Sequence, residues 1–303
     1  MNTNLKIKKS VEKALFAIAI TLIPLHNIHA QKSSDDFGIW GTFEFSQKVN
    51  KKTKFVIDAE VRSIEAVSDI ERIAVGAKLD YKIKEWKDLG KAKSDIELKT
   101  NLGYCFIYGH YLAEKSLKDD VEEDLRPYNY NIDDAYWAAR NRVYFTLTGE
   151  FKVGRFEISL RERLQYTHTG SATTTETKYR REEVIDIKGE HVGWSDEIKG
   201  PEPEFKEAKE NLSLRSRLSV KYDIPNCKVN PFVSAELYTR LDKWQAFDKA
   251  RYRVGASYKI NKKNDISLFY LYEDVSGNDP DCHAVGFEYS IDLIDLYPEN
   301  NIN

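Results

Sequence analysis

Paired arginines are the residues of this sequence best suited to chemistry. Four Arg-x-Arg pairs occur within stretches of alternating polar and apolar residues. The pairs are Arg140 and Arg142, Arg161 and Arg163, Arg215 and Arg217, and Arg251 and Arg253. In an extended strand, side chains two residues apart point to the same face, so the guanidiniums of each pair lie together. Such groups favour anions when they line a pore, and they form ion pairs when carboxylates lie beside them.

The same charged faces carry carboxylates and further basic residues. The candidate site comprises Asp58, Glu60, Arg62, Arg72, Lys78, Asp80, Glu97, Lys99, Arg140, Arg142, Glu157, Arg161, Arg163, Arg215, Arg217, Glu236, Arg251 and Arg253. Two interpretations remain open, a water-filled pore that selects anions and an ionic core of paired charges. The strand count given below predicts a narrow barrel, which favours an ion-paired lumen with at most a thin water path.

Long alternating strands must position these charges. Residues 136–168 predict two strands of about a dozen residues joined by a turn at 150–154, against about 5–6 residues for a typical strand. Eleven candidate strands span 37–47, 54–63, 70–83, 94–109, 136–149, 155–168, 210–223, 231–241, 249–260, 265–273 and 283–293. Repeated alternating segments of this length predict an all-β, transmembrane antiparallel β-barrel. The charged faces should line the lumen, because an arginine in lipid costs about 2–4 kcal/mol near the midplane.

Connection lengths give a second, independent indication of a barrel. Short turns at 50–53, 151–154, 223–230 and 261–264 alternate with longer polar loops at 64–69, 110–135, 169–209, 242–248 and 274–282. Bacterial outer-membrane barrels have short periplasmic turns and long extracellular loops. For the longest loop, 169–209, we expect either a lid in the barrel mouth or a cover over the rim.

The strand count conflicts with the even numbers found in single-chain bacterial barrels. We therefore expect ten or twelve strands, with twelve favoured. Either 37–47 is not part of the wall, or one more strand lies just before residue 37 or within 110–135.

The first thirty residues are typical of a secretory signal. Four lysines precede an apolar run over 14–25, which is too short to span a bilayer as a helix, and Ala30 marks the expected cleavage site. Cleavage changes the net charge from −3 to −6, so nucleic acid is not an expected partner. The expected organisation is a signal peptide (1–30), a short lead (31–36), the barrel (37–293) and a C-terminal tail (294–303).

The three cysteines predict neither a disulfide nor a metal site. Cys105, Cys227 and Cys282 fall in a strand, in a turn on one rim and in a loop on the other rim. A disulfide needs Cα atoms within about 7 Å, and no Cys/His spacing is typical of metal ligands. We expect no cofactor and no metal.

Three polar residues interrupt the apolar faces. Asn141, Glu162 and Ser216 occupy positions where alternation predicts lipid contact. A β-bulge that reverses the facing locally would explain them. A polar strip buried against a partner or a second copy is the alternative.

Catalysis is a separate hypothesis. His110, His168 and His283 fall at predicted outer strand ends and point outward, with Thr167 and Ser171 nearby, as a lipid-modifying barrel enzyme would require. No nucleophile motif such as GxSxG accompanies them. We therefore name no catalytic residue.

The sequence resembles a family of Gram-negative outer-membrane barrels known only as a domain of unknown function. The segments that carry the resemblance are Phe37-Gly38-Ile39-Trp40, Arg140-Asn141-Arg142, Arg161-Glu162-Arg163-Leu164-Gln165-Tyr166, Leu214-Arg215-Ser216-Arg217-Leu218 and Arg251-Tyr252-Arg253-Val254-Gly255. The likeness covers about 37–293, and the loop at 169–209 is longer than the family pattern requires. The resemblance implies a fold and an outer-membrane location, without an activity, cofactor or catalytic residue.

Three functions follow from these observations. The leading hypothesis is a structural outer-membrane barrel or a narrow passive channel for a small solute, with outer-membrane lipid as its partner. The alternatives are a lipid-modifying enzyme and a soluble periplasmic or secreted β-protein. The solute and the oligomeric state do not follow from the sequence.

Overall fold

The computed structural model describes residues 36–65, 67–89, 94–118, 125–242, 245–277 and 280–293. The predicted signal peptide (1–30), most of the short lead and the tail (294–303) lie outside these residues. The described chain is all-β apart from one 3-10 turn, η1 (Arg126–Tyr128). None of its helical segments has the length and apolar character needed to cross a membrane.

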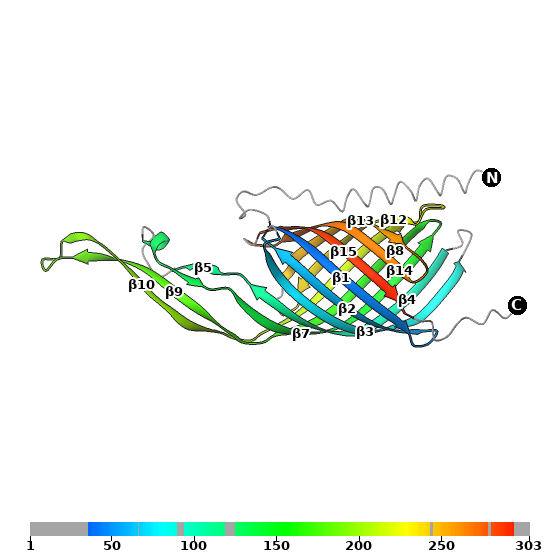
Figure 1. Ribbon diagram of the computed structural model, residues 1–303, viewed down its shortest axis with the longest axis horizontal. Helices are drawn as coiled ribbons and strands as arrows, with labels where there is room; N and C mark the ends of the chain where they lie inside the picture. Colours follow the sequence, from blue (N-terminus) through cyan, green and yellow to red (C-terminus); the bar gives the residue numbers. More distant parts are fainter. Residues whose placement is uncertain are drawn as a thin grey trace.

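Eleven strands form a closed barrel (Figure 1). They are β1 (Asp36–Lys48), β2 (Thr53–Ile64), β3 (Asp69–Leu89), β4 (Ser94–Tyr111), β7 (Tyr136–Val153), β8 (Phe156–Thr169), β11 (Lys209–Tyr222), β12 (Val229–Arg240), β13 (Gln245–Lys259), β14 (Asn264–Val275) and β15 (Cys282–Asp292). Each of the eleven strand ranges predicted from alternation overlaps one of these strands. The pattern therefore located every strand of the wall.

The expected number of ten or twelve strands is wrong. The barrel closes through a parallel pair, β1 with β15, in register from Asp36 opposite Cys282 to Ser46 opposite Asp292. All other neighbours in the ring are antiparallel. An even count is required only where every neighbour is antiparallel, and the one parallel pair lets an odd number close. The segment at 37–47 belongs to the wall, and no further wall strand is needed.

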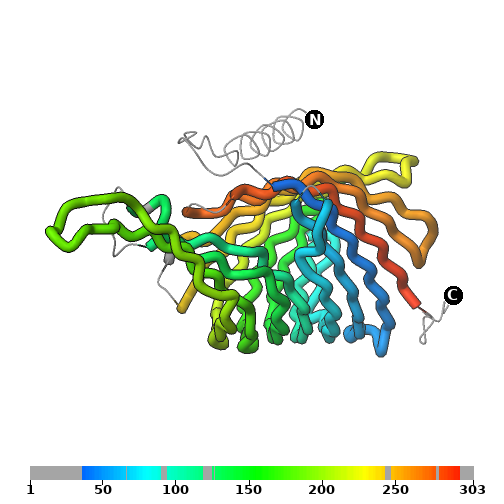
Figure 2. Tube along the Cα trace, turned by 60° about the vertical axis from the view of Figure 1, so that its left-hand side comes forward, coloured from blue at the N-terminus to red at the C-terminus, as the bar shows by residue number. Residues whose placement is uncertain are grey.

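The wall has an apolar outer face and a charged inner face. On the outer face Leu102 is 61% exposed and Leu160 is 53% exposed, whereas the inward carboxylate of Glu236 is 2% exposed. The tube view in Figure 2 shows the tilted strands side by side around the ring. The apolar faces pack against no second sheet, so the stacked-sheet arrangement of a soluble β-sandwich is absent from the described chain.

Short turns join the strands at one rim. The side chain of Asn50 accepts hydrogen bonds from the backbone N–H groups of Lys52 and Thr53, at 2.8 and 2.9 Å. Asn261 does the same for Lys263 and Asn264 at 2.8 and 3.0 Å. An asparagine that bonds its own backbone in this way stabilises a tight turn, which sets the register of the flanking strands.

The two longest loops form a second sheet that the sequence did not predict. Its strands are β5 (Glu114–Leu117), β6 (Tyr130–Asp133), β9 (Ala172–Ile185) and β10 (His191–Lys206), in the order β10-β9-β6-β5. Figure 1 shows this sheet projecting away from the barrel, so the expected lid or rim cover over 169–209 is wrong. Pro201 and Pro203 made β10 difficult to recognise, and they are tolerated because β10 is an edge strand.

Charge and aromatic contacts hold the projecting sheet together. Tyr130 stacks on Tyr179 with ring centroids 4.6 Å apart. Arg181 donates to both carboxylate oxygens of Asp196, at 2.6 and 2.7 Å. This hydrogen bonding lowers the pKa of Asp196, so the pair is charged at neutral pH.

Gly286 on β15 provides space inside the barrel for the ring of Phe269. A Cβ at Gly286 would collide with that ring, which is 5% exposed and packed against Trp40, Leu271 and Ala284. We expect Gly286→Ala to destabilise the barrel by about 1–3 kcal/mol because its Cβ would overlap three ring carbons of Phe269 and displace the ring from its packed position. The measurement is the temperature at which the folded species is lost in detergent.

Gly149→Ala is the matched control, because a Cβ at Gly149 would meet no atom within 4 Å. Its melting temperature should be unchanged or slightly higher, since alanine has the smaller entropic cost in a strand. Equal melting temperatures for the two variants would contradict the packing described for Phe269.

Candidate functional site: the charged lumen

The structure places every residue of the predicted charged site on the inward face of its strand. Asp58, Glu60, Arg62, Arg72, Lys78, Asp80, Glu97, Lys99, Arg140, Arg142, Glu157, Arg161, Arg163, Arg215, Arg217, Glu236, Arg251 and Arg253 all have the parity opposite to the exposed apolar residues of their strands. Most of them belong to a buried network at mid-height, to ion pairs along the wall, or to a set of arginines without a carboxylate partner. Asp58 and Asp80 belong to none of these groups, since neither forms an ion pair among the described residues. A role for any of them toward a solute stays a prediction.

Glu236 is the centre of the buried network. Its carboxylate accepts hydrogen bonds from Arg161 and from Arg215, the latter at 2.9 Å, and Arg251 lies 3.8 Å away. The hydroxyl of Tyr238 donates to the same carboxylate at 3.1 Å. These partners come from β8, β11, β13 and β12, so one buried carboxylate connects four strands around the ring.

Arg251 extends the network to the opposite arc of the wall. Its Nε donates to Glu273 at 2.8 Å, and Lys249 pairs with the same carboxylate at 2.8 Å. The guanidinium carbon also lies 4.7 Å from the ring centroid of Trp40, over which Arg62 stacks at 3.5 Å. Stacking on an aromatic face stabilises a cation, and more so where the cation is largely buried.

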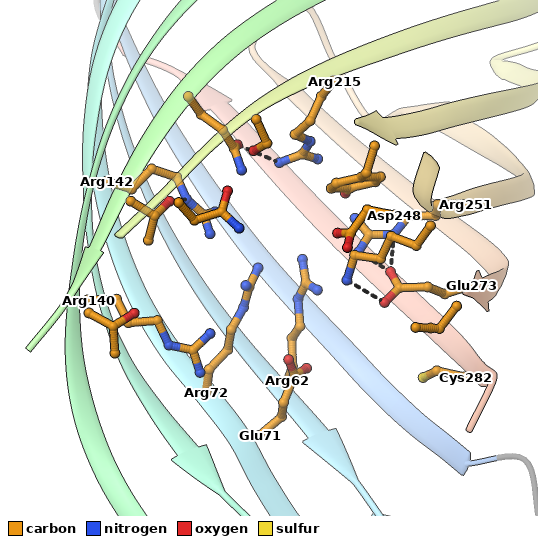
Figure 3. Close-up of a pocket in the computed structure, with 18 of the residues that line it drawn as sticks. Arg62, Glu71, Arg72, Arg140, Arg142, Arg215, Asp248, Arg251, Glu273 and Cys282 are labelled. Atoms are coloured by element: carbon orange, nitrogen blue, oxygen red, sulfur yellow. Dashed lines mark hydrogen bonds and ion pairs between the residues drawn. The ribbon is translucent and has the colours of Figure 1, made fainter. Parts of the chain in front are cut away.

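We name Trp40, Arg161, Arg215, Glu236, Arg251 and Phe269 the septum, because these largely buried side chains lie between two cavities of the lumen. On the long-loop side lies an upper cavity of about 500 Å³, whose lining includes Arg62, Arg72, Arg140 and Arg142 (Figure 3). On the short-turn side lies a lower cavity of about 250 Å³, whose lining includes Arg217 and Arg253. The two cavities share no lining residue.

Further ion pairs follow the wall. Glu60 accepts from Arg62 at 2.9 Å and from Arg72 at 2.8 and 2.5 Å. Lys78 pairs with Glu44 at 2.9 Å. Near the short-turn rim, Lys99 pairs with Glu150 at 2.9 Å, and Lys152 pairs with Glu157 at 3.2 Å. The geometry therefore favours the ionic core over an open pore.

Four arginines of the predicted Arg-x-Arg pairs differ from this pattern of ion pairing. Within the described chain, Arg140, Arg142, Arg163 and Arg217 have no carboxylate within 4.0 Å. Arg163 donates to the Thr146 hydroxyl at 3.1 Å and lies over the ring of Tyr144. The Arg-x-Arg spacing alone does not separate these residues from the paired ones, because the carboxylates come from other strands.

The bulge proposed for the polar outer residues is wrong. Pairing of β8 with both β7 and β11 is continuous, with no register shift, so the facing is not reversed. Ser216 lies opposite Glu162 and donates to its carboxylate at 2.6 Å. Asn141 accepts from the Tyr104 hydroxyl at 2.5 Å. The outer polar groups are thus paired with one another, and contact with a partner stays a prediction.

The three histidines of the enzyme hypothesis do not converge. His110 lies 3.1 Å from Asp69 and stacks on Trp137. His168 lies 4.0 Å from Glu210, and His283 bonds the hydroxyl of Tyr270. The strand order separates His283 on β15 from His110 on β4 by β1, β2 and β3. None of these contacts joins one of the three histidines to a serine or threonine hydroxyl.

The cysteines are free thiols, as predicted. Cys105 and Cys282 are half-buried, and Cys227 is exposed. In the described ranges, no group of three or more His, Cys, Asp or Glu side chains is arranged to hold a metal ion.

The fold and the lumen define a closed β-barrel with a charged interior. Residues 37–282 match the family described as "Protein of unknown function (DUF2490)", and the chain belongs to that family. No curated protein matches the sequence significantly. One similar solved structure, the "CymD monoaromatic hydrocarbon channel", has 8% sequence identity and a TM-score of 0.23, over 80% of this chain and 84% of that chain.

Removal of the central charge tests the septum. Glu236→Gln leaves Arg161 and Arg215 without their buried counter-charge, so we expect a loss of about 3–5 kcal/mol in unfolding free energy. Glu288→Gln is the control, since the Glu288 side chain is 39% exposed and pairs with Arg253 at 3.3 Å. That variant should lose about 1 kcal/mol or less. Urea unfolding in detergent measures both, and similar losses would exclude a central role for Glu236.

Proposed function

We propose that the protein is a structural outer-membrane β-barrel with a closed lumen. The apolar outer face supports membrane insertion. Leu102, Val75, Leu160, Val254 and Leu268 are each more than half exposed, on five different strands. A continuous exposed apolar belt of this kind is unfavourable in water, whereas in lipid it needs no partner. The predicted secretory signal over 1–30 supports export from the cytoplasm.

The proposed orientation follows from the two rims. Short turns lie in the periplasm, and the projecting sheet of β5, β6, β9 and β10 lies outside the cell. Closure through β1 and β15 leaves no unpaired strand edge in the wall, as a spanning structure in lipid requires.

The septum is the observation that favours a structural barrel over an open passive channel. Ion pairs and the rings of Trp40 and Phe269 lie between the two cavities, and this arrangement supports a closed lumen. A buried charge network with several partners has a high cost of disruption, so it stays closed at rest. A narrow passive channel is the second candidate, and it would require the septum to rearrange.

Planar-bilayer recordings test the closed lumen. Wild-type protein should give no stable conductance steps at neutral pH. The double variant Arg251→Ala/Glu273→Ala removes Arg251 of the septum together with its carboxylate partner, so it shortens two side chains beside the barrier without changing the net charge. We expect it to conduct.

Lys152→Ala/Glu157→Ala is the matched control, because it removes an ion pair near the short-turn rim, away from the septum. It should remain silent. Steady conductance of the wild-type protein would contradict a closed lumen, and silence of the septum variant after verified folding would contradict the assignment of the barrier.

A further inference from the structure

The upper cavity has an excess of positive charge. Among the described residues, nine basic and five acidic side chains line it. Asp36, Ile64, Thr169, Val275 and Pro280 form its outer lining, at strand ends on the long-loop side, so the cavity opens toward that rim. The excess charge is therefore accessible to a solute from one side of the barrel.

Most of the septum and wall arginines of this cavity are already neutralised. Arg62 and Arg72 share Glu60, Arg215 pairs with Glu236, and Arg251 pairs with Glu273. Arg140 and Arg142 on β7 differ from these. Neither lies within ion-pair distance of a carboxylate in the described ranges, although both line the same cavity.

The partners of Arg140 and Arg142 are uncharged. Nε of Arg142 donates to the Thr167 hydroxyl at 3.1 Å. The guanidinium of Arg140 lies against the backbone of Gly109, where any side chain would collide with it, and 4.8 Å from the ring centroid of Tyr111. Its Nε is buried without a hydrogen-bond partner. A guanidinium has five donors and no acceptor, so both groups retain N–H donors directed at the cavity.

The arrangement of these arginines matches an oxyanion. Figure 3 shows Arg62, Arg72, Arg140 and Arg142 directed into one space, from β2, β3 and β7. Like charges gathered away from bulk water repel one another, and a negatively charged ligand in their midst removes that cost. Guanidinium forks bind carboxylate and phosphate oxygens with paired hydrogen bonds.

We propose that the upper cavity is a binding site for a small oxyanion with at least two negative charges, held by Arg140 and Arg142. The cavity volume of about 500 Å³ admits a molecule of the size of pyrophosphate or citrate. The ligand enters from the long-loop rim and does not pass the septum. This site is independent of whether the barrel conducts.

Isothermal titration of the full chain, folded in zwitterionic detergent at low ionic strength, tests the site with pyrophosphate as probe. Wild-type protein should bind it, and Arg140→Gln/Arg142→Gln should weaken binding at least tenfold. Arg253→Gln is the matched control, because Arg253 faces the lower cavity and is neutralised by Glu288. Its affinity should equal that of the wild type.

Two further measurements distinguish loss of binding from loss of folding, and a free anion from a phosphate carried on a lipid. Without anion, the double glutamine variant should be at least as stable as the wild type, because two uncompensated charges have been removed. Purified lipid A, which presents phosphates on a membrane lipid, should not compete with pyrophosphate for a site inside the barrel. Absence of wild-type binding, equal binding by the double variant, or displacement by lipid A would overturn the proposal.

Discussion

Closure of the wall is the constraint on which the rest of the structure depends. The parallel pair of β1 and β15 completes a ring in which every strand has two neighbours. Once the ring is closed, alternation leaves only two environments, inside and outside. Most apolar residues of the strands lie outside, so most of the charged residues must be accommodated in a narrow interior.

That interior is organised by a small number of carboxylates. Glu236, Glu273 and Glu60 each accept from two or more basic groups, and together they occupy six arginine and lysine side chains. The supply of carboxylates is insufficient near the long-loop rim. Arg140 and Arg142 are left with neutral partners, and this local shortage is the basis of the anion site proposed for the upper cavity.

Sequence alternation predicted the strands and the facing of their residues, because the period of two is a local property. The number of strands in the wall could not be predicted from the same pattern, because it depends on whether the strands that contain Phe37 and His283 pair in parallel. An even-number rule drawn from other barrels gave the wrong answer here. Alternation along a single strand also could not predict the septum, because the partners of Glu236 come from three other strands.

Some missed residues had a usable signal. Trp40 shares its parity with Glu44, so alternation alone would have placed an aromatic ring in the lumen. The sequence signal for the projecting sheet is weaker. The alternating threonines of β9 suit a strand, whereas Gly200, Pro201 and Pro203 obscure β10, and only its position at the sheet edge explains how they fit.

The central claim is that hydrocarbon contacts the apolar outer face and that the charged face is enclosed. Spin labels on a variant with Cys105, Cys227 and Cys282 replaced by serine test it directly in proteoliposomes. Labels at Leu102 and Leu160 should collide with oxygen and be shielded from a water-soluble nickel chelate. Labels at Ser219 and Ser234, which line the lower cavity, should show the reverse preference. Chelate-accessible labels at Leu102 and Leu160 would contradict the account.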